Sequence, residues 1–245
     1  DAFIGSISTV SSQLARDRVS LDKTSFLARY GHLRPGTYDI LSARYDENPD
    51  HYFNWDDRAS AFSSSEIFSL TLPQMRELTS LLQHHCLEAN PVSLFDFMQA
   101  GIELRELAKF HFTHNLSDAM VLMGEVGREY DIDREDLAFC NSSVFQEMYT
   151  AETDARSLML RSIEEGKEKY EKALRTGLPP IITKPEDVWS FKWPKTQPNF
   201  ITQKQVTSRV VGCEHKDMLK DAIVCIPNAD PGFDWLFAYP IAGLI

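Results

Sequence analysis

Histidines are the side chains in this sequence with the widest chemical range near neutral pH, because imidazole can act as a base, a nucleophile or a metal ligand. The seven histidines are His32, His51, His84, His85, His111, His114 and His215. His84 and His85 are adjacent in a predicted helix, so their side chains point about 100° apart and do not easily chelate one ion. His111 and His114 could share a helical face. The sequence indicates no third ligand beside them, so we predict no metal site.

The stretch YGHLRPGTYDILSARYDE, Tyr30–Glu47, gathers the most suggestive polar side chains. Arg34 and Arg44 could present planar guanidinium groups to a carboxylate or a phosphate, and His32 could titrate near neutrality. The alternative is structural, with both arginines holding a long connector against the helices. Their partners would then be the acids of the same stretch, Asp39, Asp46 and Glu47. The structural interpretation is favoured, and a binding role stays open.

A second candidate binding surface is the segment ELRELAKF. Arg105 and Lys109 are four residues apart and would share a helical face, with Glu106 close enough for an ion pair. The face could be a solvated one, or it could form an electropositive groove for an anionic ligand. The neighbouring apolar residues indicate a core, although some could line a pocket between helices. They are Phe95, Phe97, Met98, Phe110, Phe112, Met120 and Met123.

The elements that must position these residues are mostly helices, since apolar residues recur every three or four positions up to about Gly177. The predicted helices are Ser20–Gly31 with Ser20 as N-cap, Thr71–Asn90 with Thr71 as N-cap, Ser93–Phe112, Asn115–Tyr130 and Ala151–Gly177. From Leu178 to Asn199 the chain is rich in Pro, Lys and Trp and resembles a linker. Strands are then expected in Gln203–Gly212 and Leu219–Asp230. Asp230 and Pro231 favour a turn that caps a short helix around Trp235.

The composition limits which binding partners and which cellular compartment are expected for this protein. A formal net charge of −11 over 245 residues argues against nucleic acid, because phosphate backbones need clustered cations. The four cysteines form no CxxC pair and are interpreted as reduced core thiols of a cytoplasmic protein. No stretch approaches the roughly 20 apolar residues of a membrane span, so no membrane partner is expected.

The C-terminal stretch LKDAIVCIPNADPGFDWLFAYPIAGLI resembles the start of the swivelling phosphohistidine domain of PEP-utilising phosphotransferases, the family of PEP synthase, pyruvate phosphate dikinase and rifampicin phosphotransferase. In that family a strand ends in a segment like Asn228–Pro231, and a short helix and a strand like Ala242–Ile245 follow. YGHLRPGTYDILSARYDE, ELRELAKFHFTHNLSDAM and REDLAFCNSSVFQEM are similar to parts of the helical middle domain. The similarity therefore spans most of the chain.

The resemblance implies an α+β protein, with a mainly helical body followed by the first strands of a β/α swivelling domain. The expected domains are a helical middle domain (1–180), a linker (181–199) and the start of the swivelling domain (200–245). The family's Gly-Gly pair and Ser/Thr/Cys-His dipeptide, whose histidine carries phosphate, would follow Ile245. An ATP-grasp domain would precede Asp1. None of the seven histidines has the required neighbours, so we expect the chain alone to be catalytically inert.

The expected reaction of the parent protein is transfer of a phosphoryl group from ATP through histidine to pyruvate or another small organic acceptor. ATP and Mg²⁺ would be needed by the full-length enzyme, and no cofactor is expected in this chain. The resemblance implies that His32, Arg34 and Arg44 line the path of the phosphorylated histidine or its acceptor, that Arg105 and Lys109 receive the acceptor, and that Asp230 supports the phosphohistidine loop. The alternative function is a helical binding module without enzymatic activity.

Overall fold

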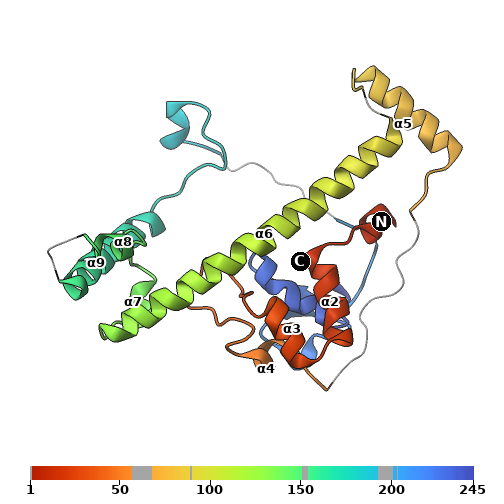
Figure 1. Cartoon of the computed structure of the whole chain (residues 1–245). Coiled ribbons are helices and arrows are strands. Elements are labelled where there is room, and N and C mark those ends of the chain that lie inside the picture. Colours follow the sequence, from red (N-terminus) through yellow and green to blue (C-terminus); the bar gives the residue numbers. More distant parts are fainter. Residues whose placement is uncertain (1, 57–67, 89, 151–153, 193–200, 203) are drawn as a thin grey trace. The chain divides into compact units, whose positions relative to one another are not determined.

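The computed structural model describes residues 2–56, 68–88, 90–150, 154–192, 201–202 and 204–245. Most of these residues are helical and a small sheet lies near the C-terminus, which confirms the expected mainly helical α+β class (Figure 1). The chain forms two compact units. The terminal unit contains Asp1–Asp118 and Ile201–Ile245, and the middle unit contains Ala119–Phe200. The division predicted at residues 180 and 200 stays a prediction, and residues 193–199 of its linker lie outside the described part.

The N-terminal segment of the terminal unit contains four short helices, α1 (Ala2–Ser6), α2 (Val10–Ser20), α3 (Lys23–Tyr30) and α4 (Pro49–Tyr52). The prediction of Ser20 as an N-cap was wrong. Ser20 is the last residue of α2, and Asp22 caps α3 by accepting a hydrogen bond from the backbone N–H of Ser25. Aspartate and serine are equally good N-caps. Which of two such residues caps a helix is decided by its position relative to the free N–H groups of the first helical turn.

Helix α5 (Leu72–His84) begins as predicted, with Thr71 and Gln74 in a capping box. Helix α6 runs unbroken from Pro91 to Glu129, so the predicted interruption near residues 113–114 was wrong. No proline or glycine interrupts the helix there, and the Thr113 hydroxyl donates to the Phe110 carbonyl oxygen at 3.0 Å within the helix. Helix α6 contributes residues to both units.

The middle unit contains α7 (Arg134–Leu137), α8 (Val144–Glu147), α9 (Ala155–Leu174) and a 3₁₀ turn η1 (Pro185–Val188). The first three residues of the predicted helix Ala151–Gly177 lie outside the described part. Helix α9 buries Leu158, Met159 and Ile163. At Gly166 a Cβ atom would lie 1.9 Å from the Phe139 carbonyl oxygen, so the loop after α7 approaches α9 closely because this position has no side chain.

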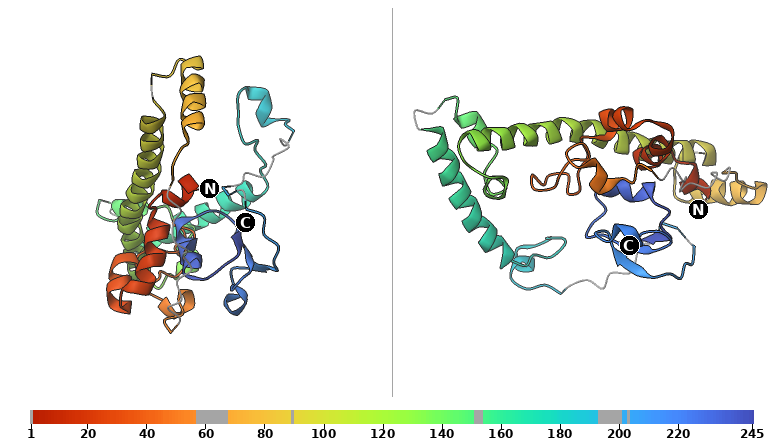
Figure 2. Two further views of the ribbon diagram at one scale, coloured as in Figure 1. Left: turned by 90° about the vertical axis from the view of Figure 1, so that its right-hand side faces the viewer. Right: turned by 90° about the horizontal axis from the view of Figure 1, so that it is seen from below.

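The C-terminal segment forms three parallel strands in the order β1 (Val210–Gly212), β2 (Ile223–Cys225) and β3 (Gly243–Leu244). The strands are shorter than predicted. The 3₁₀ helices η2 (Lys216–Met218) and η3 (Pro231–Ala238) lie in the two connections. Helix α2 packs on η3, and Figure 2 shows the N-terminal helices beside this C-terminal segment. One core therefore unites sequence from both ends of the chain.

That core is apolar and tightly closed. Leu14 of α2, Phe26 of α3, Val224 of β2 and Leu236 of η3 are fully buried in it. Each such side chain stabilises the fold by about 1.5–3 kcal/mol relative to an exposed one. The described helices include none that is both long and apolar enough to cross a membrane.

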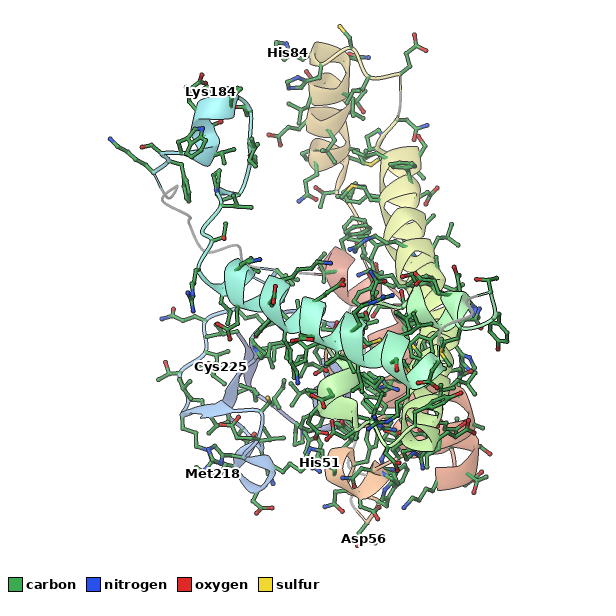
Figure 3. The ribbon with its side chains drawn as sticks, turned by 90° about the vertical axis from the view of Figure 1, so that its left-hand side faces the viewer. His51, Asp56, His84, Lys184, Met218 and Cys225 are labelled. Carbon is green, nitrogen blue, oxygen red and sulfur yellow. The ribbon has the colours of Figure 1, made fainter. Side chains whose placement is uncertain are left out.

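The four cysteines are free thiols, but the prediction that they are core residues was wrong, because two of them, Cys140 and Cys213, are only partly buried and the other two are exposed. Cys86, in the turn after α5, and Cys225, the last residue of β2, are exposed. Cys225 is labelled in Figure 3. Alternate residues of a strand face opposite sides, so the burial of Val224 directs Cys225 outward.

Candidate functional site

Two segments from opposite ends of the sequence meet in the terminal unit. We call this contact the joint: residues 31–37 of the GHLRPGT segment against residues 228–232 of the NADPG turn. The Asp230 carboxylate accepts hydrogen bonds from the Thr37 backbone N–H at 3.1 Å and the Thr37 hydroxyl at 2.8 Å. Its other oxygen accepts from the Gly232 N–H at 2.8 Å. Asp230 therefore caps η3, as predicted, and also holds the GHLRPGT segment.

Close backbone packing completes the joint. A Cβ atom at Gly232 would lie 1.7 Å from the Arg34 carbonyl oxygen, so only glycine fits without movement. The buried Tyr45 hydroxyl donates to the Gly232 carbonyl oxygen at 2.7 Å and accepts from the Trp235 N–H at 3.2 Å. These contacts position the start of η3 against the N-terminal segment.

Arg34 is buried behind the joint and donates hydrogen bonds to oxygens of the protein itself. Its guanidinium donates to the Ser117 hydroxyl at 3.2 and 3.3 Å, to the Asp39 carbonyl oxygen at 3.3 Å and to the Ser42 carbonyl oxygen at 3.2 Å. These bonds attach the connector after the joint to α6. They agree with the structural interpretation of Arg34, in which it holds the connector against the helices. The prediction named the Asp39 carboxylate as a partner, whereas Arg34 donates to the Asp39 backbone carbonyl oxygen.

Arg44 binds two carboxylates from different elements. It contacts both oxygens of Asp46, at 2.9 and 2.7 Å, and one oxygen of Asp118 on α6 at 2.6 Å. The hydrogen bond from Arg44 lowers the pKa of Asp118. A two-pronged pair of this kind fixes geometry as well as charge, so Arg44 also holds the connector to α6 in this structure.

His32 lies in the same layer, with only 3% of its surface exposed. Its ring centre is 4.6 Å from that of His114, and its Nε2 atom has no hydrogen-bond partner among the described residues. Burial, together with the nearby His114 and Arg44, lowers the pKa of His32 to about 4. The ring is therefore neutral at neutral pH. Within the described part of the chain, no group of three or more His, Cys, Asp or Glu side chains could hold a metal ion.

Arg105 and Lys109 share helix α6 but have different surroundings. Arg105 is exposed and pairs with its neighbour Glu106 at 2.9 Å. Lys109 is half-buried and lines a cavity next to the joint. The predicted groove shared by both cations is therefore not seen, because only Lys109 lies at the cavity.

This joint cavity has a volume of about 260 Å³ and is lined by residues from three separate segments. They are Thr37 and Tyr38 after the GHLRPG turn, Lys109, Phe112 and Thr113 of α6, and Asn228, Ala229, Asp230 and Pro231 of the NADPG turn. Of the six predicted site residues, Lys109 and Asp230 line it. His32, Arg34, Arg44 and Arg105 do not.

Sequence reasoning did not single out Tyr38 or Asn228. The available signal for Tyr38 was its position just after the Pro35-Gly36 turn. Residues at turns are mostly exposed, so an aromatic side chain there is unusual. For Asn228 the sequence offers no signal apart from its place beside Asp230.

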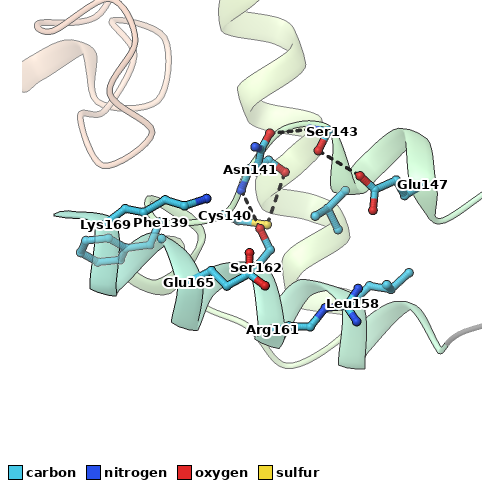
Figure 4. Close-up of a pocket in the computed structure, with 12 residues that line it drawn as sticks. Phe139, Cys140, Asn141, Ser143, Glu147, Leu158, Arg161, Ser162, Glu165 and Lys169 are labelled. Atoms are coloured by element: carbon cyan, nitrogen blue, oxygen red, sulfur yellow. Dashed lines mark hydrogen bonds between the residues drawn. The ribbon is translucent and has the colours of Figure 1, made fainter. Parts of the chain in front are cut away.

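A second cavity, of about 440 Å³, lies within the middle unit (Figure 4). Its walls are the loop between α7 and α8, helix α8 and one face of α9. The Asn141 N–H donates to the Ser162 hydroxyl at 2.9 Å, and the Ser143 hydroxyl donates to Glu147 at 3.1 Å. Cys140 lines this cavity, and burial raises the pKa of its thiol, which makes it a poorer nucleophile. Cations and carboxylates alternate along the α9 wall, so no single ligand charge is favoured there.

No protein-family model, curated protein or solved structure matches this chain. A function must therefore be inferred from the residues themselves and from the geometry of the joint.

Proposed function

We propose that this chain is part of an ATP-dependent phosphotransferase of the PEP-utilising family, in which a histidine beyond Ile245 carries the phosphoryl group. The helical body would be the middle domain, and residues 201–245 would begin the swivelling domain. A strand, the NADPG turn, a short helix and a parallel strand follow one another in the order that the resemblance implies. The proposed parent protein is cytoplasmic.

The observation that supports the proposal most is that β2 and β3 end at the same edge of the sheet. The two strands are parallel, with Val224 paired to Leu244, so their carboxyl ends lie at the same edge of the sheet. The chain after β2 leads into the NADPG turn, which lines the joint cavity. Ligands of open parallel sheets bind beyond the carboxyl ends of the strands. A phosphohistidine loop directly after β3 would therefore begin at the sheet edge from which the chain leads into the NADPG turn.

Each part of the chain then has a role in positioning. Lys109 and Asp230 would lie on the acceptor side, while His32, Arg34 and Arg44 would support the connector and the joint. The acceptor oxygen would attack the phosphorus of the phosphohistidine, the N–P bond would break, and the hydroxyl proton would pass to solvent. Such a transfer depends chiefly on alignment and charge stabilisation. ATP and Mg²⁺ would be bound by the ATP-grasp domain of the parent protein.

The first experiment is to read the gene beyond the codon for Ile245. We expect a Gly-Gly pair followed within a few residues by Ser, Thr or Cys and then His. The full-length protein, incubated with Mg²⁺ and radioactively labelled ATP, should acquire acid-labile, alkali-stable label. Replacing that histidine with asparagine should abolish the label. A continuation without such a histidine would overturn the proposal.

In the same full-length protein, Arg34→Ala and Arg44→Ala test the two buried or half-buried arginines. If they support the connector, both variants should lose stability, and Lys109→Met should impair transfer without such a loss. Normal stability with impaired transfer in the arginine variants would instead assign them to the acceptor path.

A second candidate function is that of a helical binding module. It is favoured by large apolar side chains on α5 and the first half of α6 that remain largely exposed among the described residues. They include Leu72, Leu81, Val92, Phe97 and Leu104. The labelling experiment separates the two candidates, since a binding module acquires no phosphohistidine.

A further inference from the structure

We propose that the joint cavity binds a flat aromatic ligand that carries an anionic group, such as an aromatic carboxylate. The ligand class follows from the residues that line the cavity. Only its role as the phosphoryl acceptor rests on the function proposed above.

Two aromatic rings on separate segments are left uncovered at this cavity. Tyr38 is 74% exposed and Phe112 is 56% exposed, and both line the same hollow. Exposed large side chains that converge on one cavity indicate a binding surface, whereas singly exposed ones are common. Aromatic rings prefer other rings in offset-stacked or edge-to-face arrangements. A flat aromatic ligand therefore fits this lining better than an aliphatic one.

Lys109 supplies the positive charge. No described residue forms an ion pair with its ammonium group, although α6 offers a paired cation one turn earlier in Arg105. The acidic residue of the lining, Asp230, already accepts three hydrogen bonds, from the backbone and hydroxyl of Thr37 and from Gly232. The Asp230 carboxylate is therefore stabilised by protein donors. Lys109 lies near enough to the buried Asp234 to lower the pKa of that carboxyl group, but no described acid is within ion-pair distance of the Lys109 ammonium group, so its charge can also attract an anion.

The volume sets the size of the ligand. A cavity of about 260 Å³ lies just below the ~300–1,000 Å³ of pockets that hold drug-sized molecules. One ring with one or two small substituents would fill it. The Asn228 amide, on the wall formed by the NADPG turn, could hydrogen-bond such a substituent.

If the proposed function holds, a hydroxyl on this ligand is the phosphoryl acceptor. The carboxyl ends of β2 and β3 share an edge, and the turn that follows β2 forms one wall of the cavity. The ring would be held between α6 and the NADPG turn, with its anion at Lys109 and its hydroxyl toward the edge from which the carrier histidine would arrive.

The binding test uses the chain itself and 4-hydroxybenzoate as the probe, with affinity measured by calorimetry and NMR. Two comparison compounds each lack one feature: 4-hydroxybenzyl alcohol lacks the anion, and 4-hydroxycyclohexanecarboxylate lacks the aromatic ring. We expect millimolar or tighter binding of the probe, weaker binding of both analogues, and shifted amide signals at Tyr38, Lys109 and Asn228. Equal affinity for all three compounds, or no binding of the probe, would overturn the proposal.

Matched variants locate the site. Lys109→Met keeps the length of the side chain and removes the charge, and we expect it to weaken probe binding about tenfold, as for the loss of one charged hydrogen bond. Phe112→Leu should weaken binding of the probe more than that of 4-hydroxycyclohexanecarboxylate. Arg105→Met, on the same helix but outside the cavity, should leave the affinity unchanged. An equal effect of Lys109→Met and Arg105→Met would place the probe elsewhere and refute the proposal.

The labelling experiment on the full-length protein separates this inference from the proposed function. In one outcome, the wild-type protein binds the probe, Lys109→Met binds it more weakly, and the full-length protein never acquires phosphohistidine. That result would support the ligand proposed for the cavity and refute the phosphotransferase function. Phosphohistidine formation in a protein that fails to bind the probe would refute the cavity and support the phosphotransferase.

Discussion

At the scale of single residues, burial moves two titratable side chains toward their neutral forms. His32, buried beside α6, has its pKa lowered to about 4, and Asp234, buried in η3, has its pKa raised to about 7. In both cases the largest cause is the loss of contact with water, which penalises the charged form. Neutral side chains at these positions let the joint and its surroundings pack densely.

The titration of His32 can be measured directly. Its pKa in the folded state lies below the ordinary value of 6.5, so its contribution to stability is complete above pH 6.5 and is lost as the pH falls toward 4. We expect the ring signals of His32 in NMR spectra to titrate with a midpoint near pH 4. A midpoint close to 6.5 would show that the ring is accessible to water and would contradict the burial of His32.

Asp234 should give the opposite dependence of stability on pH. The folded state binds its proton more tightly than the unfolded chain, whose ordinary pKa is 3.8, so the stabilisation is complete below pH 4 and is lost as the pH rises through about 7. After burial, the Ser11 hydrogen bond lowers this pKa, Glu106 and Asp230 raise it, and Lys109 lowers it.

Replacing Asp234 with asparagine tests this dependence. Asp234→Asn should be more stable than wild type at pH 8, by roughly 2–4 kcal/mol, since each pKa unit corresponds to about 1.4 kcal/mol. The difference should shrink at pH 4, as measured by urea denaturation at both pH values. A constant difference between the two proteins would refute the assignment.

At the scale of secondary-structure elements, two glycines allow backbones to approach one another. Gly232 begins the close contact of η3 with residues 34–35, and Gly166 lets α9 contact the loop after α7. Neither glycine has the left-handed backbone conformation that favours glycine. Their importance is therefore steric, and alanine substitution measures it directly.

Gly232→Ala should weaken the joint. The added Cβ would meet the Arg34 carbonyl carbon and oxygen, which cannot move without shifting the whole connector. We expect a loss of about 1–3 kcal/mol in the free energy of unfolding, as for other overpacked sites. Gly243→Ala is the control, because its Cβ would be no closer than 3.6 Å to any atom outside its immediate neighbours. Similar stability of the two variants in urea would argue against the joint.

Gly166→Ala and Gly101→Ala form a second pair, both in helix interiors. At Gly101 nothing lies within 4 Å of an added Cβ, so alanine should stabilise the chain by about 0.5–1 kcal/mol through helix propensity. At Gly166 the clash with Phe139 should reverse that sign. Thermal unfolding followed by circular dichroism would show the two opposite shifts, and shifts of equal sign would contradict the close approach.

At the scale of the whole molecule, the terminal unit is built from sequence that is not contiguous. Leu14 and Phe26, from the N-terminal segment, share their core with Trp235 and Leu236, near the C-terminus. The two segments should therefore unfold together, because neither can bury its apolar surface alone.

Leu236→Ala tests this coupling. Leu236 is fully buried, so its truncation should cost about 2–5 kcal/mol. Amide hydrogen exchange should then accelerate in α2 and α3 as well as in η3, while exchange in α9 of the middle unit stays the same. Leu244→Ala, at a side chain 38% exposed, is the control and should have a small effect. Faster exchange confined to η3 would show that the C-terminal segment is an independent element.

Much of the local structure could be predicted from the sequence, since it depends on neighbouring residues. Thr71 caps α5 as expected, in a capping box with Gln74, and Asp230 caps η3 as its place before Pro231 suggested. Errors arose where two neighbouring residues could serve equally well, as with Ser20 and Asp22. They also arose near Thr113, where two helices were predicted and a single helix continues.

The sequence by itself determined the mainly helical class, most of the helices, the caps at Thr71 and Asp230 and the approximate positions of the first two strands, because these follow from periodicity and local hydrogen bonding. Only the tertiary structure decided that Lys109 and Asp230 line one cavity while Arg105 lies outside it, and that Arg34 and Arg44 are occupied by protein oxygens. Which distant segments meet depends on the burial of one shared core and on close approaches such as that at Gly232. Such contacts leave no periodic pattern in the chain.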